Sequence, residues 1–310
     1  MYLRFGWVVG NVGLIGTLTI VTLSTFITFL TSLSIAAIAT NAPVKTGGAY
    51  FMISRSLGVE IGGAIGIPLY LAQAFSIALY IIGFSESIVS IFPHVNIKLV
   101  GIVTTLILGT LSLFSTKATI RAQFFILGVI IMSLLSLVLG HPIENSQIEM
   151  WGAPAAKSES FWKVFAVFFP AVTGIMAGVN MSGDLKDPAK SIPKGTFFAI
   201  AVGYVIYMTL PLVLASRADA LTLVENPLIM RQIAFWGGAI LLGVWGATLS
   251  SAVGSLLGAP RVLQALTNDQ VLPRPLSFMG KGSGKEKIPR AATIFTILLT
   301  LILVYLGNLN

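Results

Sequence analysis

The sequence predicts an all-α polytopic membrane protein. Three observations support this class: 10% of the 310 residues are charged, against roughly 25% in soluble domains, 55% are hydrophobic, and the mean hydropathy is +0.92. The apolar residues gather in runs long enough to cross a bilayer, without the alternation of a membrane barrel. The chain has no cysteine, which excludes disulfides and thiolate chemistry. We therefore expect a multi-pass protein of the cell membrane.

The start of the chain predicts a half-helix followed by a full span. Residues 2–9 are apolar but too few to cross a bilayer, so they are expected to form the outer half of a first helix whose inner half is missing. The sequence Gly10-Asn11-Val12-Gly13 is expected to form a turn. A second span follows at 13–38.

A polar, glycine-containing loop is expected at 41–56, and a third span at 58–86. Three glycines, Gly58, Gly62 and Gly66, recur every fourth residue at the start of this span. Small residues at this spacing lie on one helix face and allow close packing of a neighbouring helix.

The remaining regular spans are separated by polar or proline-containing loops. They are expected at 97–115, 122–140, 196–215, 233–266 and 291–307.

The sixth segment, 161–185, is apolar but is expected to be broken in the middle. Pro170 removes a backbone donor, and Gly174 and Gly178 weaken the helix soon after it. One half should end near Pro170 and the second should begin near Ile175. Free carbonyls on one side of such a break suit a cation, and free N–H groups on the other suit an anion. A proline kink that only aids packing is the alternative.

The basic residues predict the orientation in the membrane. Thirteen of the 19 fall on the loops after segments two, four, six and eight, and five fall on the opposite loops. By the positive-inside rule the even-numbered loops are cytoplasmic, as are both ends of the intact protein. Because these residues border apolar spans, the basic pI of about 9.8 indicates membrane orientation rather than a nucleic-acid partner.

Five stretches closely resemble the cation–chloride cotransporters, a family of the amino acid–polyamine–organocation superfamily. They are 177–196, which begins AGVNMSGDLKDP, 37–41 (AIATN), 47–58 (GGAYFMISRSLG), 80–86 (YIIGFSE), and 247–252 (ATLSSA) with 259–261 (APR). The sequence looks most similar to the sodium-coupled branch, the sodium–potassium–chloride and sodium–chloride cotransporters.

The resemblance implies a transporter core of two inverted five-helix repeats (LeuT-like), in which helices one and six face each other. This chain would supply a single, incomplete transporter domain over 1–310, from the outer half of helix one through helix nine. It would be a secondary-active symporter that couples chloride to sodium, and to potassium, by alternating access, with no cofactor. A homodimer is common in the family.

The resemblance also implies a potassium site. The family's potassium ligands match Pro170 and Thr173 of the broken segment and Tyr80 of the third span. Neutral oxygens can hold a weakly hydrated monovalent cation without a carboxylate. The alternatives are an interhelical hydrogen bond from Tyr80 and a bond from Thr173 to its own backbone.

The family's sodium site matches Ala247, Ser250 and Ser251, which lie on one helix face at i, i+3 and i+4. A carbonyl and two hydroxyls there offer three hard oxygens to a small cation. The alternative is that Ser251 bonds back to the Ala247 carbonyl.

The family's chloride site matches Gly174, Ile175 and Met176, which act through their backbone N–H groups. Further family ligands lie on the inner part of helix one and on helix ten, which are not in this sequence, so the chain as given is not expected to transport.

The outer gate is predicted to use Arg4 and Glu86. Arg4 lies in an apolar stretch, where a charge is costly unless it is paired or hydrated, and Glu86 is the carboxylate at the outer end of the third span. The family's gating charges match these positions. Snorkelling of Arg4 to the interface is the alternative.

Three competing functions remain at this point. An amino acid permease of the same superfamily would use the free N–H groups to bind a substrate carboxylate. A membrane enzyme is disfavoured, because the sequence has no metal-binding cluster, nucleophile–base set or P-loop. A scaffold or a fragment of a degenerate gene is the third.

Overall fold

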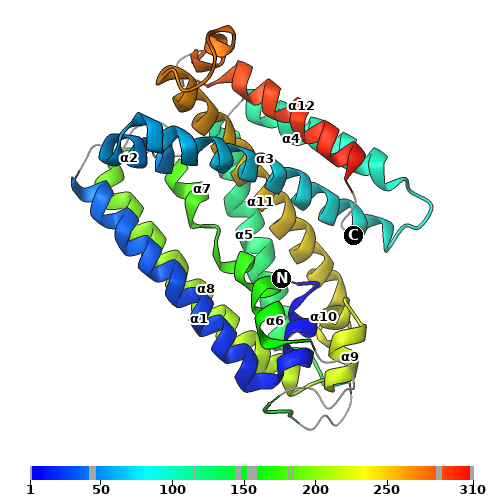
Figure 1. Ribbon diagram of the computed structural model, residues 1–310. Helices are drawn as coiled ribbons and strands as arrows, with labels where there is room; N and C mark the ends of the chain where they lie inside the picture. The colour runs from blue at the N-terminus through cyan, green and yellow to red at the C-terminus, as the bar shows by residue number, and fades with distance from the viewer. Residues whose placement is uncertain are drawn as a thin grey trace. The chain divides into compact units, whose positions relative to one another are not determined.

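The structure is a computed structural model that consists of helices and short connections. It describes residues 2–41, 47–114, 116–143, 148–151, 159–180, 182, 185–283 and 288–307. The helices are α1 (Phe5–Asn41), α2 (Gly48–Leu57), α3 (Val59–Val89), α4 (Ile97–Phe114), α5 (Thr116–Val138), α6 (Phe161–Phe168), α7 (Ile175–Asn180), α8 (Pro188–Ala215), α9 (Ala220–Glu225), α10 (Ile229–Ile233), α11 (Gly237–Asn268) and α12 (Arg290–Leu306) (Figure 1). Two short 3₁₀ helices, η1 (Phe169–Val172) and η3 (Arg274–Gly280), complete the described elements.

The chain forms two compact units. Unit 1 comprises Met1–Ser34, Gly128–Ile175 and Lys194–Val244. Unit 2 comprises Ile35–Leu127, Met176–Pro193 and Trp245–Asn310.

The predicted break near the start of the chain is confirmed at Gly13 of α1. Gly13 has φ 70° and ψ −177°, a left-handed φ that glycine adopts without steric cost. The break frees the N–H groups of the next two residues, which donate to loop carbonyls instead: Leu14 to Glu149 (2.9 Å) and Ile15 to Met150 (3.0 Å). The start of the helical piece after Gly13 is therefore held by the loop that precedes α6.

In unit 1, α1 and α8 lie side by side (Figure 1). The Thr22 and Tyr204 hydroxyls lie 3.2 Å apart, and the Phe29 and Phe197 rings are 5.7 Å apart. Arg217 donates to the carbonyls of Leu137 and Val138 at 2.5 and 2.7 Å, which satisfies the free end of α5.

In unit 2, helices α3, α4 and α12 pack against one another (Figure 1). The approach of α4 to α12 depends on glycine, because a Cβ built on Gly101 would lie 2.6 Å from Val304 and one on Gly109 would lie 2.7 Å from Ile297. The Tyr70 and Thr296 hydroxyls lie 3.2 Å apart and join α3 to α12. These are the small-residue contacts expected between helices in a membrane.

The prediction of a loop over 41–56 was wrong, because the structure has the helix α2 from Gly48 to Leu57. The fully buried Tyr50 donates to Asp269 Oδ2 (2.9 Å), and Arg55 pairs with Asp269 Oδ1 (2.7 Å). Burial raises the pKa of the Tyr50 hydroxyl, and the hydrogen bond to Asp269 raises it further. The helix is too short for a span, so a search for apolar runs misses it.

The predicted packing role of the early α3 glycines is confirmed for two of the three. A Cβ built on Gly62 would lie 2.5 Å from Ser54, and one on Gly66 would lie 2.5 Å from the Tyr50 ring. Gly58 instead starts the helix with φ 98°, a conformation that favours glycine. Helix α2 therefore packs against the face of α3 that carries Gly62 and Gly66.

Three other boundaries differ from the prediction. Helix α8 starts at Pro188 rather than 196, because proline is well suited to the first helical turn. Helix α5 starts at Thr116 rather than 122, and the loop before α11 contains the short helices α9 and α10.

Five helices are long and apolar enough to cross a membrane by length and composition. They are α1, α3, the part of α5 from Arg121 to Val138, α8 and α11. Large apolar side chains are exposed on them, including Phe124 (71%), Phe125 (77%) and Phe198 (73%). Such exposure is costly in water and is expected in lipid.

Candidate functional site

The sixth segment is broken where the sequence predicted. Helix α6 ends at Phe168, the 3₁₀ helix η1 covers Phe169–Val172, and α7 begins at Ile175. Proline lies within η1, and Thr173 (φ −89°, ψ 0°) follows it. The regular ladder of i→i−4 hydrogen bonds is therefore interrupted between Phe168 and Ile175.

Pro170 and Thr173, two of the predicted potassium ligands, lie together at this break. The Thr173 hydroxyl donates to the Pro170 carbonyl at 2.9 Å, and the Thr173 N–H approaches the same carbonyl at 3.4 Å. The bond of Thr173 to its own backbone, the alternative considered from the sequence, is thus present. Because the Thr173 hydroxyl donates its proton to the Pro170 carbonyl, its oxygen lone pairs stay available to a cation.

An aromatic cluster supports the break in unit 1. The rings of Phe5, Phe168 and Tyr207 lie 5.5–5.9 Å apart pairwise, and both phenylalanines are fully buried. The Tyr207 hydroxyl donates to the Ala171 carbonyl at 3.4 Å. The first piece of α1, the end of α6 and the middle of α8 are therefore joined at one point beside the break.

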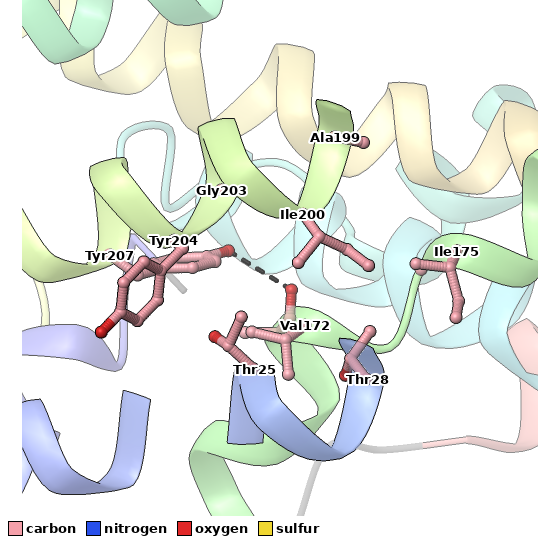
Figure 2. A pocket seen from close by; sticks show the side chains of 11 residues that line it. Thr25, Thr28, Val172, Ile175, Ala199, Ile200, Gly203, Tyr204 and Tyr207 are labelled. Atoms are coloured by element: carbon pink, nitrogen blue, oxygen red, sulfur yellow. Dashed lines mark hydrogen bonds between the residues drawn. The ribbon is translucent and has the colours of Figure 1, made fainter. Parts of the chain in front are cut away.

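A cavity of about 200 Å³ adjoins the break within unit 1. We call it the break cavity; it is lined by Thr25, Thr28, Ala171, Val172, Gly174, Ile175, Ala199, Ile200, Gly203, Tyr204 and Tyr207. Figure 2 shows the two threonines of α1 on one side, the α8 residues on the other, and Val172 between them. Liquid water occupies roughly 30 Å³ per molecule, so the break cavity is of a size for ions and a few waters.

The lining of the break cavity is neutral and mainly apolar, with hydroxyl groups at its wall. Thr28 donates to the Ser24 carbonyl at 3.2 Å. Thr25 is 9% exposed, and within the part of the chain that the structure describes its hydroxyl has no hydrogen-bond partner. A buried hydroxyl without a partner is costly, so Thr25 is a polar group of unit 1 that the described contacts leave unsatisfied.

Two of the three predicted chloride residues border the break cavity. Gly174 and Ile175 line it, and a Cβ built on Gly174 would meet nothing within 4 Å, so the space beside this backbone is open. Met176 belongs to unit 2. Sequence reasoning missed the α1 and α8 lining, although Thr22, Thr25 and Thr28 recur every third residue in an apolar span.

The predicted sodium residues all lie in unit 2, on one face of the unbroken helix α11. The Ser251 hydroxyl donates to the Ala247 carbonyl at 2.8 Å, which is the alternative bond considered from the sequence. The Ser250 hydroxyl donates to Gln123 Oε1 of α5, and Gln123 Nε2 donates to the Ser250 carbonyl at 3.1 Å. Each serine therefore has a fixed acceptor for its proton. Gln123 was not predicted.

The remaining predicted residues are divided between the units. Arg4 is exposed in unit 1, whereas Tyr80 and Glu86 are half-buried on α3 in unit 2. Glu86 borders a small cavity of about 30 Å³ together with Lys98. The Arg4–Glu86 pair and the approach of Tyr80 to the break stay predictions.

Where the structure describes the motif after the break, Asn180 and Ser182 are fully buried, whereas the part around Asp187 is exposed. Asp187 pairs with Lys190 at 3.3 Å, three residues apart and largely exposed, while Met181, Gly183 and Asp184 lie outside the described residues. Among the described residues there is no group of three histidine, aspartate or glutamate side chains that could hold a metal ion.

Comparison with known proteins gives the family. The amino acid permease family matches residues 1–310. Solute carrier family 12 member 1 of Mus musculus is 32% identical over 371 residues, member 2 of Homo sapiens 33% over 370, and member 8 of Mus musculus 36% over 325. Each alignment covers 100% of this chain, and the chain spans 34%, 30% and 46% of these relatives.

The three identities are of similar size, so the choice of the sodium-coupled branch stays a prediction. The family itself is decided by the full-length match and the relatives together. The resemblance to the cation–chloride cotransporters is confirmed by the solute carrier family 12 relatives, and the chain belongs to the amino acid permease family, whose members are multi-pass membrane transporters and not enzymes.

Proposed function

We propose that residues 1–310 belong to one transporter domain of a secondary-active symporter that moves chloride with sodium and potassium. The observation that carries this proposal is the break at Pro170–Gly174, which has a small neutral cavity beside it. Irregular backbone at membrane depth is tolerated where it is buried in protein or lines a wet cavity. A transporter exploits such backbone by using it to hold ions.

Potassium is assigned to the carbonyl side of the break. The Pro170 carbonyl and the Thr173 hydroxyl lie within hydrogen-bond distance of each other, so one cation can touch both oxygens. Neutral oxygens replace the hydration shell of potassium at small cost, because this ion is weakly hydrated. Tyr80 is the third ligand in this proposal.

Chloride is assigned to the N–H side of the break, at Gly174, Ile175 and Met176. The N–H groups at the beginning of α7 lack partners inside a helix and carry partial positive charge. The open space beside Gly174 supports the assignment, because an anion needs room next to the backbone.

Sodium is assigned to Ala247, Ser250 and Ser251 of α11. In the structure both hydroxyl protons point to other acceptors, which leaves oxygen lone pairs for a small hard cation. The gating pair Arg4–Glu86, the cytoplasmic even-numbered loops and a homodimer belong to the same proposal.

An amino acid permease is the second candidate, since that is the family that matches the whole chain. Its substrate carboxylate would take the N–H groups that we assign to chloride. The substrate ammonium group would then need acceptors, and the break cavity offers hydroxyls and carbonyls but has no carboxylate among its described lining residues. This lining favours small ions.

Uptake of rubidium, which replaces potassium, by the full-length protein in proteoliposomes tests the proposal. Uptake should require both sodium and chloride and should stop when gluconate replaces chloride. Chloride-dependent uptake without sodium would remove the sodium assignment. Absence of rubidium uptake, together with uptake of an amino acid, would favour the permease.

A further inference from the structure

A glutamine of α5 contacts the predicted sodium site twice. Gln123 Nε2 donates to the Ser250 carbonyl at 3.1 Å, and the Ser250 hydroxyl donates back to Gln123 Oε1. Both residues lie in unit 2 and both are half-buried. The pairing closes a ring between one side-chain amide and one serine, so the amide has a single orientation: its nitrogen faces the carbonyl and its oxygen faces the hydroxyl.

This ring determines where the Ser250 proton points. A serine in a helix ordinarily donates to a carbonyl three or four residues earlier, as Ser251 does to Ala247 at 2.8 Å. Ser250 donates across to α5 instead. A hydroxyl has one proton and two lone pairs, and a cation binds the lone pairs. With its proton held by Gln123, the Ser250 oxygen presents its lone pairs away from α5.

We propose that Gln123 is a positioning residue for the sodium site. This proposal rests on the proposed function, because it gives Gln123 a role in the binding of a sodium ion at α11. Gln123 orients the Ser250 hydroxyl before the ion arrives and holds α5 against α11 at that residue. Interhelical bonds from a glutamine also hold membrane helices together, so the test must separate orientation of the Ser250 hydroxyl from helix packing.

The test compares Gln123→Met with Gln123→Glu in the full-length protein. Methionine keeps the length of the side chain and removes both bonds, whereas glutamate keeps an acceptor for the Ser250 proton. We expect Gln123→Met to raise the sodium concentration for half-maximal uptake about tenfold, the value of one hydrogen bond, with the chloride and rubidium values unchanged. Gln123→Glu, unlike Gln123→Met, should have a sodium affinity close to that of the unchanged protein.

The matched control is Gln73→Met on α3 of the same unit. Gln73 is also a half-buried glutamine, and among the described residues its Oε1 has no hydrogen-bond partner. Its replacement removes an intramembrane amide without touching Ser250, so the sodium value should not change. Where Gln123→Met does not fold, Gln123→Asn replaces it, because the shorter amide withdraws from Ser250, and the same results are expected.

Three outcomes overturn the proposal, and they are distinguishable. Sodium-dependent uptake by the unchanged protein with an unaltered sodium value in Gln123→Met removes the role of Gln123 and leaves the proposed function standing. In the second outcome, Gln123→Met raises the sodium, chloride and rubidium concentrations for half-maximal uptake equally, with Gln123→Glu no better. That result indicates a merely structural role. Uptake by the unchanged protein that does not depend on sodium overturns both the proposed function and this inference.

Discussion

The broken segment of unit 1 and the unbroken helix α11 of unit 2 present oxygen atoms in different ways. In both regions a side-chain hydroxyl donates to a backbone carbonyl three or four residues earlier: Thr173 to Pro170 at 2.9 Å and Ser251 to Ala247 at 2.8 Å. At the break, however, the backbone itself has lost its helical partners. In α11 the backbone ladder continues, and two of the three proposed ligand oxygens are side-chain hydroxyls.

This difference predicts how each region responds to substitution. A site made of backbone groups tolerates a change of side chain, provided that the φ/ψ angles and the space around them survive. A site made of hydroxyls on a regular helix loses a ligand with each hydroxyl removed. We therefore expect α11 to be sensitive to side-chain identity and the break to be sensitive to backbone geometry and volume.

The largest effect is expected for Ser251→Ala on α11. It removes one of the proposed sodium ligands, and a bond to a charged partner is worth about 2 kcal/mol, so sodium affinity should fall roughly 30-fold. Sodium-22 binding to the purified protein measures this. Ser76→Ala is the matched control, because the Ser76 hydroxyl is also exposed and donates to Ala72 at 2.8 Å. Equal effects of the two substitutions would contradict the sodium assignment.

The next effect is expected for Thr173→Val, which replaces the hydroxyl at the break by a methyl group of similar size. Because the Pro170 carbonyl remains, we expect rubidium affinity to fall by about tenfold, less than the loss at α11. The rubidium concentration for half-maximal uptake measures the change. Thr209→Val on α8 is the control, since Thr209 makes a comparable bond to Val205 at 2.8 Å. If the two variants behave alike, the Thr173 hydroxyl is not a ligand.

A smaller effect is expected from filling the break cavity. Gly203 lines it, and a Cβ at this residue would meet nothing within 4 Å, so Gly203→Leu occupies the cavity without displacing backbone. We expect uptake to slow by about fivefold while the melting temperature holds or rises, because leucine favours helix over glycine. Gly195→Leu is the matched control: Gly195 is on the same helix, also has open space, and is not part of this lining. Unchanged uptake in Gly203→Leu would show that the break cavity plays no part in transport.

The sequence predicted those features that depend on backbone chemistry. The break at Gly13 follows from the left-handed φ of that one glycine, and the break at Pro170–Gly174 follows from the backbone donor that the proline lacks. Helix α2 was missed because it is short and amphipathic, so its place depends on contacts such as the one with Asp269, 219 residues after Tyr50. Such tertiary contacts leave no local pattern.

The candidate site was predictable to a similar extent. The residues of the break and of α11 follow from a local motif, whereas Gln123 and the tyrosines of α8 do not. Their role arises from which helix lies next to which. Gln123 lies between the basic first turns of α5 and the exposed Phe124 and Phe125, and nothing in its sequence neighbours indicates that it reaches Ser250.

The smallest effect is expected for Ile175→Val and Met176→Leu, at the proposed chloride residues. Each substitution keeps the N–H group and changes the volume of an apolar side chain slightly, so the chloride concentration for half-maximal uptake should stay within about twofold of its original value. Gly174→Pro is the opposite case: it removes the N–H group that an anion needs and should raise the chloride value strongly. A large effect of the two conservative changes, with none from Gly174→Pro, would mean that side chains rather than backbone form the anion site. The contrast between the break and α11 would then fail at the point where it is most specific.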